Sequence, residues 1–357
     1  MEVNIYNLLE IYEKEISKNT KNKKRINNFE RNKIENIYDI KNMIEKVNYK
    51  VGKYNIFSIN SPKYRIVMSL SIKDKIINHY VARNILINKL DKYLDIRNGA
   101  TRKNKGLDYT IKLLIKYLEE YKKKGKFYIL KIDISKYFYS IDHIVLKDLL
   151  IDKLDEEEYQ IISNIIDSTN FDYINEEIIK IKNKLLKIDK KRYKEIEKIP
   201  LIDKGKSLPI GNMSSQFLSI FYLYKLDHYI IHNLKLKHTV RYMDDYVILH
   251  HDKEYLKKLM NIIKEKLSEE YKLKTNENKT FIVDSYNGFD FLGYRFRITN
   301  NKINIRIKSE NKRRRDKNIK KNNYLYNNGY ITYKRYFNSM NNYKNSYKFA
   351  KNNIVCD

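Results

Sequence analysis

Three aspartates stand where the sequence otherwise favours a buried core. Asp133 lies near the end of the apolar run from Tyr128 to Ile134, and Asp244 and Asp245 lie between the short runs TVRYM and YVILH. Buried carboxylates need a partner of opposite charge or a metal ion. Three of them converging from separate strands can hold two Mg²⁺ or Mn²⁺ ions about 3.5 to 4 Å apart, which stabilises attacking and leaving oxygens in phosphoryl transfer. These residues therefore indicate two-metal chemistry.

The aspartate pair also has an ordinary explanation, because aspartates are common in hairpin turns. Neighbouring residues of a strand point to opposite faces, so Asp244 and Asp245 cannot both face the same ions squarely. We expect Asp133 and Asp244 to be the main ligands and Asp245 an auxiliary one. His250 and His251 follow the hairpin, and the end of a strand explains them better than a metal site does.

The elements around the aspartates predict an α+β fold with an antiparallel sheet. Short runs rich in β-branched and aromatic residues predict strands, and apolar residues at helical spacing predict helices. Ser214 is expected to cap the apolar helix that follows it, and a stripe of Leu and Ile after Tyr255 predicts another helix. Strand, helix, hairpin, helix and strand in this order is the layout of a polymerase palm. The predicted strands are Tyr128–Ile134, TVRYM, YVILH, TFIVD, FDFLGYRF and KINIRIK, with further helices at 1–50, 151–200 and beyond Ser309.

Composition narrows the class of partner. Lys and Arg number 73 against 44 Asp and Glu, and the net charge of +29 favours a polyanion such as nucleic acid. A strongly AT-biased genome would also enrich Lys, Asn, Ile and Tyr, so the charge alone does not decide. The single cysteine, Cys356, excludes a disulfide framework within one chain. No apolar run approaches the roughly 18 to 20 residues needed to cross a bilayer, and we expect a cytoplasmic protein without a membrane partner.

Several motifs resemble those of bacterial reverse transcriptases, in the order in which that family carries them. RYMDDYVIL, from Arg241 to Leu249, resembles the family's metal-binding hairpin, and LKIDISKYFYSIDH, from Leu130 to His143, resembles the strand with its first catalytic Asp. LPIGNMSSQ, ending at Gln216, resembles the segment that lies against template and incoming nucleotide. The resemblance covers about residues 50 to 300 and includes the further motifs PKYR, NGATRKNKG, NENKT and FDFLGYRF.

The resemblance implies an RNA-directed DNA polymerase with the right-hand fold of fingers, palm and thumb. The implied substrates and partners are an RNA template, a primer and deoxynucleoside triphosphates, with an accessory protein or a cognate non-coding RNA left open. The implied site residues are Asp133, Asp244, Asp245 and the carbonyl of Ile134 for the metals, Lys63 and Arg65 for the triphosphate, Phe138 against a ribose 2′-hydroxyl, Ile210 and Gln216 beside the nucleotide, and Lys279 as general acid toward pyrophosphate.

Each of these roles has a simpler alternative. Phe138 can be core packing after a strand, and Lys279 can be one surface lysine among many. The basic cluster Lys312, Arg313, Arg314 and Arg315 suits a thumb helix that contacts the phosphates of an RNA/DNA duplex, but a solvated helix has the same pattern.

Ile210 indicates which subtype of reverse transcriptase the chain resembles. Group II intron and retroviral enzymes have Gln at this place, whereas the Ile-Gly-Asn form resembles the enzymes of diversity-generating retroelements. Reverse transcriptases of phage defence are an alternative, and the signatures of retrons are not found. An RNA-dependent RNA polymerase is disfavoured by Phe138 and the YMDD sequence, and a non-catalytic, maturase-like RNA-binding protein is disfavoured by the three aspartates.

The pattern changes along the chain predict three regions. Residues 1–127 would form N-terminal helices and fingers, and residues 128–308 a palm with a charged helical insertion at about 151–204. Residues 309–357 would form a basic thumb.

Overall fold

The computed structural model describes residues 2–299 and 302–351, and Cys356 lies outside them. The chain forms two compact units, each assembled from three separate stretches. The first contains Met1–Lys103, Ile134–Lys235 and Ile263–Thr275, and the second contains Asn104–Asp133, Leu236–Ile262 and Asn276–Asp357. These interleaved units do not follow the consecutive boundaries 1–127, 128–308 and 309–357, which remain a prediction about polymerase subdomains. Within the described residues, no helix is long and apolar enough to span a membrane.

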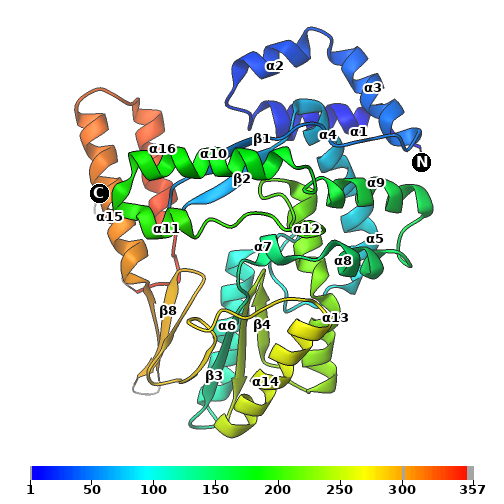
Figure 1. Ribbon diagram of the computed structural model, residues 1–357. Helices are drawn as coiled ribbons and strands as arrows, with labels where there is room; N and C mark the ends of the chain where they lie inside the picture. Colours follow the sequence, from blue (N-terminus) through cyan, green and yellow to red (C-terminus); the bar gives the residue numbers. More distant parts are fainter. Residues whose placement is uncertain (1, 300–301, 352–357) are drawn as a thin grey trace. The chain divides into compact units, whose positions relative to one another are not determined.

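The first unit is mainly helical and contains one antiparallel pair of strands, β1 (Asn55–Ile59) and β2 (Arg65–Ser69), with α10 beside β1 (Figure 1). The helical character expected for residues 1–50 and 151–200 is confirmed. The helices are α1 (Ile5–Ile11), α2 (Lys23–Glu30), α3 (Lys33–Glu45), α4 (Ile72–Tyr80), α5 (Asn88–Leu90), α7 (Tyr137–Ser140), α8 (His143–Leu150), α9 (Glu156–Asp167), α10 (Tyr173–Ile188), α11 (Tyr193–Glu197), α12 (Met213–Tyr222) and α13 (Tyr224–His228). Short π or 3₁₀ segments are η1 (Tyr12–Ser17), η2 (Val81–Ile87), η3 (Asp91–Tyr93), η4 (Lys190–Arg192) and η5 (Tyr229–Asn233).

The start of α12 differs from the sequence prediction. Asn212 is the N-cap residue and Ser214 lies inside the first turn. The Ser214 hydroxyl accepts a hydrogen bond from Asn78 Nδ2 at 2.8 Å, and its backbone amide donates to Asn78 Oδ1 at 3.1 Å. Ser214 therefore joins α12 to α4 instead of capping its own helix.

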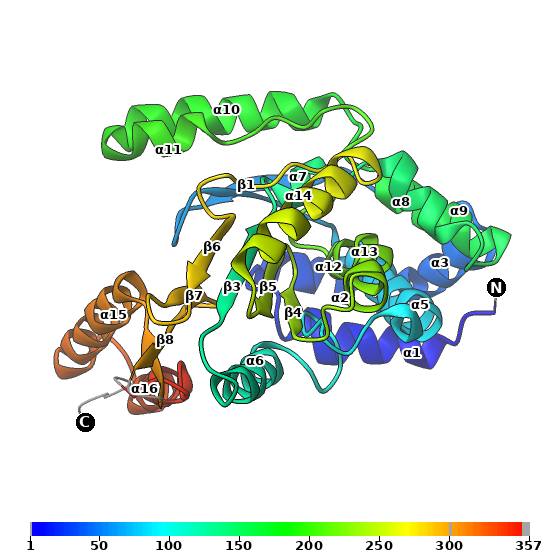
Figure 2. The same cartoon turned by 90° about the horizontal axis from the view of Figure 1, so that it is seen from below.

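The second unit is built on a four-stranded antiparallel sheet in the order β4, β5, β3, β6. The central strand β3 (Tyr128–Asp133) is buried almost throughout, as its apolar sequence predicts. It pairs with β5 (Asp245–His250), and the outer strands are β4 (Thr239–Tyr242) and β6 (Phe281–Asp284). The helix α6 (Leu107–Lys122) packs its apolar side against this sheet (Figure 2).

A second, three-stranded sheet contains β7 (Phe289–Phe291), β8 (Tyr294–Thr299) and β9 (Lys302–Ile307). The pattern of FDFLGYRF predicted a single strand, whereas its resemblance to the family implied a turn around Gly293. The segment is a hairpin with its turn at Gly293. Leu292 and Gly293, with φ of 47° and 84°, form its two-residue turn, because two consecutive left-handed residues reverse the chain tightly.

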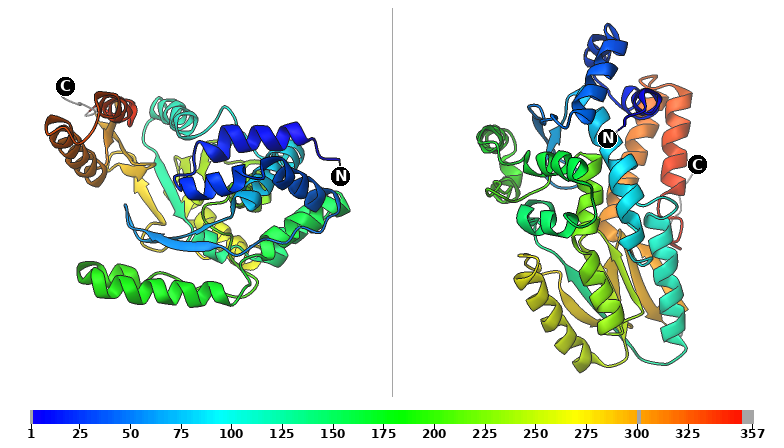
Figure 3. Two further views of the ribbon diagram at one scale, coloured as in Figure 1. Left: turned by 90° about the horizontal axis from the view of Figure 1, so that it is seen from above. Right: turned by 90° about the vertical axis from the view of Figure 1, so that its right-hand side faces the viewer.

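The remaining helices are α14 (Lys253–Glu269), α15 (Ser309–Asn327) and α16 (Tyr333–Asn345). The last two lie side by side (Figure 3). The predicted α+β class with antiparallel sheets is confirmed.

Candidate active site

Strand pairing brings the aspartates to one end of the four-stranded sheet. Asp133, the last residue of β3, lies directly opposite Asp245, the first residue of β5. Directly opposed residues of an antiparallel pair project from the same face. Asp244 belongs to the two-residue turn between β4 and β5, in which Met243 has a φ of 57°. This backbone conformation is uncommon for a residue with a side chain and marks the turn as strained.

Two lysines compensate the negative charge of the aspartates. Lys279 Nζ lies 2.8 Å from Oδ1 and 3.1 Å from Oδ2 of Asp133. Lys131 Nζ lies 3.3 Å from Asp245 Oδ1 and donates a hydrogen bond to the Asp290 carbonyl at 2.7 Å. Lys131 was not expected at the site, although its position supplied a signal. Apart from Asp133 it is the one charged residue of the apolar strand β3, two residues before Asp133 and thus on the same face.

The charges of the cluster are strongly coupled. Burial raises the pKa of Asp245 to about 6, against the opposing effect of Lys131, and the carboxylates of Asp244 and Asp133 raise that pKa further. Asp133 and Asp244 therefore each disfavour the ionised form of Asp245, and a divalent cation bound there would offset this effect.

The donor set fits a divalent cation in its chemistry. Carboxylate oxygens are the preferred ligands of Mg²⁺ and Mn²⁺, and a cation would relieve the repulsion among these three. Across residues 2–299 and 302–351, however, no group of three or more His, Cys, Asp or Glu side chains is already arranged to hold a metal. Lys279 engages both oxygens of Asp133, so metal binding there requires this lysine to move.

Two buried groups hold the ends of these strands. Arg241 on β4 is 1% exposed, and its guanidinium donates to the carbonyl of Met243 at 2.9 Å. The Asp133 amide donates to the hydroxyl of Thr280 at 3.3 Å. Both contacts orient the backbone that carries the aspartates, and neither residue was singled out from the sequence for this role.

The histidines after the hairpin have structural contacts, as predicted. His251 Nδ1 hydrogen-bonds with the Lys126 carbonyl at 2.8 Å, and its ring stacks on Tyr121. His250 packs against the ring of Tyr255.

The first unit holds the residues expected to contact the nucleotide. Lys63 and Arg65 are exposed, at the end of the β1–β2 loop and the start of β2. The insertion holds this loop: Arg192 Nη1 donates to the Asn60 carbonyl at 2.7 Å, and Glu195 accepts from the Tyr64 amide at 2.6 Å.

Backbone hydrogen bonds join three of the motif segments within this unit. The Met68 amide on β2 donates to the Ile210 carbonyl at 3.0 Å, and the Leu208 amide donates to the Phe138 carbonyl at 2.8 Å. Gly211 has a φ of 119°, and a Cβ atom there would lie 3.1 Å from Val67 Cγ1. Only glycine fits this conformation and close approach without strain.

The side chains of these segments differ in exposure. Phe138 and Ile210 are half-buried, and Gln216 is exposed on α12. Ile134 is buried and pairs with Thr275 in an isolated bridge.

The basic cluster of α15 is not uniformly accessible. Lys312 and Arg313 are exposed, and Arg314 is half-buried and donates to Asn311 Oδ1 at 3.2 Å. Arg315 is only 4% exposed and pairs with Asp316 at 3.2 Å. The expectation that Arg315 faces a phosphate backbone is therefore corrected, because successive helical residues point in different directions and this one is turned inward.

The raised pKa of Asp245 predicts that Asp245→Asn stabilises the metal-free protein at neutral pH. The carboxyl has an ordinary pKa of 3.8 and a folded pKa of about 6, so its ionisation increasingly destabilises the fold as pH rises through this window. The gain should be about 1 to 3 kcal/mol at pH 7.5 and vanish below a pH of about 4. Urea unfolding with EDTA at both pH values measures it, and an equal or lower stability of the variant at pH 7.5 would contradict the assignment.

Comparison with known proteins identifies the family. The chain matches the reverse transcriptase (RNA-dependent DNA polymerase) family over residues 44–296. No curated protein matches it in sequence.

Solved telomerases have limited similarity to the chain. Apo telomerase from Candida tropicalis, truncated from its C-terminal domain, has a TM-score of 0.49 and 12% identity, covering 77% of this chain and 60% of that one. A second apo telomerase from Candida tropicalis has a TM-score of 0.46 and 13% identity, covering 71% and 48%. Candida albicans telomerase with a TWJ fragment of telomeric RNA has a TM-score of 0.46 and 16% identity, covering 74% and 46%.

The chain thus spans 46 to 60% of the length of these telomerases. The family match extends over more than half of the chain, and the matched residues include Asp133, Asp244 and Asp245. The protein belongs to the reverse transcriptase family, the RNA-directed DNA polymerases, and its described elements form an α+β fold with antiparallel sheets.

Proposed function

We propose that this protein copies RNA into DNA with two divalent metal ions held by Asp133 and Asp244, with Asp245 as an auxiliary ligand and the Ile134 carbonyl as a further one. The observation that carries this proposal is the register that sets Asp133 opposite Asp245, beside the turn with Asp244. Bound there, Mg²⁺ or Mn²⁺ would stabilise the attacking and leaving oxygens of nucleotidyl transfer.

The charged side chains of the chain have complementary tasks in this proposal. Lys279 neutralises Asp133 in the metal-free protein and, once released from it, serves as the general acid toward pyrophosphate. The exposed cations Lys63 and Arg65 neutralise the triphosphate. Lys312 and Arg313 contact the phosphates of the RNA/DNA duplex, a role that their exposure supports.

The aromatic ring of Phe138 is proposed to exclude a ribose 2′-hydroxyl. Phe138 is half-buried, and its carbonyl accepts a hydrogen bond from the Leu208 amide. Both features support this role, because a ring that is held in place can exclude the larger ribonucleotide by its volume. Gln216, exposed on α12, is proposed to lie beside the nucleotide.

The biological setting is proposed to be a diversity-generating retroelement, with a phage-defence system as the alternative. Ile210 supports the diversity-generating retroelement. Its apolar side chain can only make van der Waals contacts, whereas an amide in its place would hydrogen-bond the nucleotide or its neighbours. The Ile210 carbonyl already accepts a hydrogen bond from the Met68 amide, so any effect of Ile210 on the nucleotide is expected to come from its side chain. We propose that this makes synthesis error-prone, especially opposite adenine.

Loss of a metal ligand should abolish synthesis. Asp133→Asn and Asp244→Asn should abolish primer extension on RNA with Mg²⁺ or Mn²⁺, and Asp245→Asn should reduce it strongly, since each removes several kcal/mol of transition-state stabilisation. Asp284→Asn is the matched control, because Asp284 lies opposite Tyr128 in the sheet, at the other end of β3 from Asp133. It should leave extension unchanged. Extension by Asp244→Asn at the wild-type rate would contradict the proposed catalytic site and leave the non-catalytic RNA-binding alternative.

Removal of the ring at position 138 should admit ribonucleotides. The ratio of kcat/KM for dGTP over GTP should fall by about tenfold or more in Phe138→Ala, since this ratio measures the difference in transition-state binding. Phe171→Ala, which removes an exposed ring elsewhere in the same unit, should leave it unchanged. An unchanged ratio in Phe138→Ala would assign Phe138 to packing.

An amide at position 210 should improve accuracy. Ile210→Gln should lower misincorporation opposite template adenine by about tenfold, because one hydrogen bond to the nucleotide is worth about 1 to 3 kcal/mol. Sequencing of products made by both proteins in the same buffer and metal measures the effect. Equal error spectra would remove Ile210 from the argument for a diversifying enzyme.

A further inference from the structure

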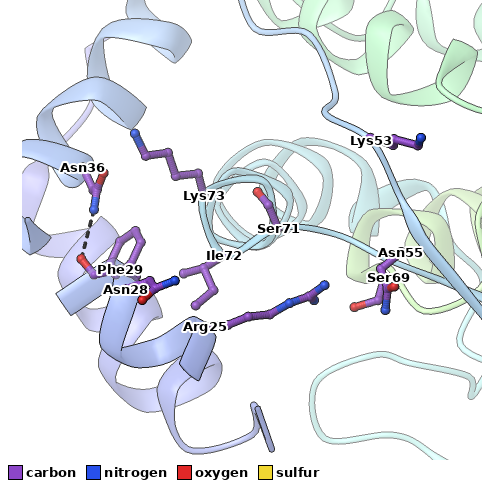
Figure 4. A pocket seen from close by; sticks show the side chains of 10 residues that line it. All are labelled: Arg25, Asn28, Phe29, Asn36, Lys53, Asn55, Ser69, Ser71, Ile72 and Lys73. Carbon is purple, nitrogen blue, oxygen red and sulfur yellow. Dashed lines mark hydrogen bonds between the residues drawn. The ribbon is translucent and has the colours of Figure 1, made fainter. Parts of the chain in front are cut away.

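A basic cavity of about 400 Å³ lies in the first unit, and its lining includes none of the residues with a proposed catalytic role. It is lined by α2, α3, the two strands β1 and β2 and the start of α4 (Figure 4). Its lining includes the cations Arg25, Lys53 and Lys73 and contains no Asp or Glu. Cavities that bind small ligands have volumes of about 300 to 1,000 Å³, so this one has room for a nucleotide.

The guanidinium of Arg25 is available to a ligand. It extends from α2 toward Ser69 and Asn55, whereas Lys73 points away from it and pairs with Asp39 at 2.8 Å (Figure 4). Within the part of the chain that the structure describes, the Arg25 guanidinium has no hydrogen-bond or ion-pair partner. A half-buried guanidinium without a partner is a favourable site for a phosphate, which accepts two of its hydrogen bonds.

A second cation adds to this positive field. Lys75, two residues after Lys73 on α4, is half-buried and likewise has no side-chain partner among residues 2–299 and 302–351. Burial lowers the pKa of Lys75, and the charge of Arg25 lowers that pKa further. Two unneutralised cations that repel each other are unfavourable, and a bound anion would offset this cost.

The rest of the lining suits a base more than a bare anion. The side-chain amides of Asn28 and Asn55 have no hydrogen-bond partner among the described residues. Asn36 donates to the Phe29 carbonyl at 2.9 Å, which leaves its amide oxygen as an acceptor. Amides both donate and accept hydrogen bonds, as the edges of bases do. Phe29 and Ile72 add apolar surface.

We infer that this cavity binds one nucleotide, with its phosphate on Arg25 and its base against the asparagine amides. The nucleotide is either free or part of a single-stranded RNA. A second cavity of about 210 Å³ is lined by Lys75, further along α4 than Ile72 and Lys73, and by the motif residues Gly211 and Met213, with one acid, Glu15. Its place on the same helix favours the RNA strand, because a strand is long enough to contact both cavities. The inference goes beyond polymerisation and does not depend on it.

Binding to the purified full-length chain tests the inference. Calorimetry with AMP, ribose 5-phosphate and adenosine, and fluorescence anisotropy with a short labelled single-stranded RNA, are carried out in EDTA without primer. AMP or the RNA should bind, and Arg25→Glu and Lys53→Glu should each weaken that binding by about tenfold or more, as expected for loss of a charge-assisted contact. Binding of AMP assigns the free nucleotide, and binding of RNA alone assigns the strand.

Matched controls separate the cavity from general charge. Lys24→Glu on α2 and Lys50→Glu before β1 change the same net charge at exposed residues outside the cavity, and each should alter affinity by less than about twofold. Thermal unfolding checks that the variants fold. If Arg25→Glu does not fold, Lys53→Glu alone is used for the test. Absence of binding by AMP and RNA, equal losses in variants and controls, or equal affinity for AMP and ribose 5-phosphate would overturn the assignment.

Discussion

The facing of two aspartates, Asp133 buried and Asp245 half-buried, is the constraint on which the palm-like sheet depends. The register of β3 and β5 opposes Asp133 and Asp245 at the end of a nearly apolar sheet, where repulsion and desolvation both act against the ionised forms. Lys131 and Lys279 offset this cost by pairing with Asp245 and Asp133. An arrangement that packing alone would not favour is therefore maintained by positive charge, and the same need for a cation underlies the proposed chemistry.

The two units meet functional demands by different means. In the second unit, side-chain charges balance one another, so a single substitution alters both stability and chemistry. In the first, backbone contacts such as Met68 to Ile210 and Leu208 to Phe138 fix the motif segments. Backbone bonds leave the side chains of those segments available to discriminate between nucleotides.

Much of this organisation was predictable because the patterns are local. The apolar run of β3, the DD hairpin and the helical stripes of α14 each appear within a short window of sequence. The errors arose where distant contacts decide. Ser214 bonds to Asn78, a residue 136 positions away, and the inward direction of Arg315 depends on what packs against α15. The pairing of Lys279 with Asp133 likewise needs the strand order, which no local pattern contains.

The insertion that holds the β1–β2 loop has a consequence for protein engineering. Tyr64 and Asn60 bond to Asp189, Glu195 and Arg192 across 125 to 132 residues of sequence. The loop therefore depends on a distant segment for its conformation and is not an independent cassette. Chimeras that exchange this hairpin between family members should therefore transfer the insertion with it, so that the contacts between the two are kept.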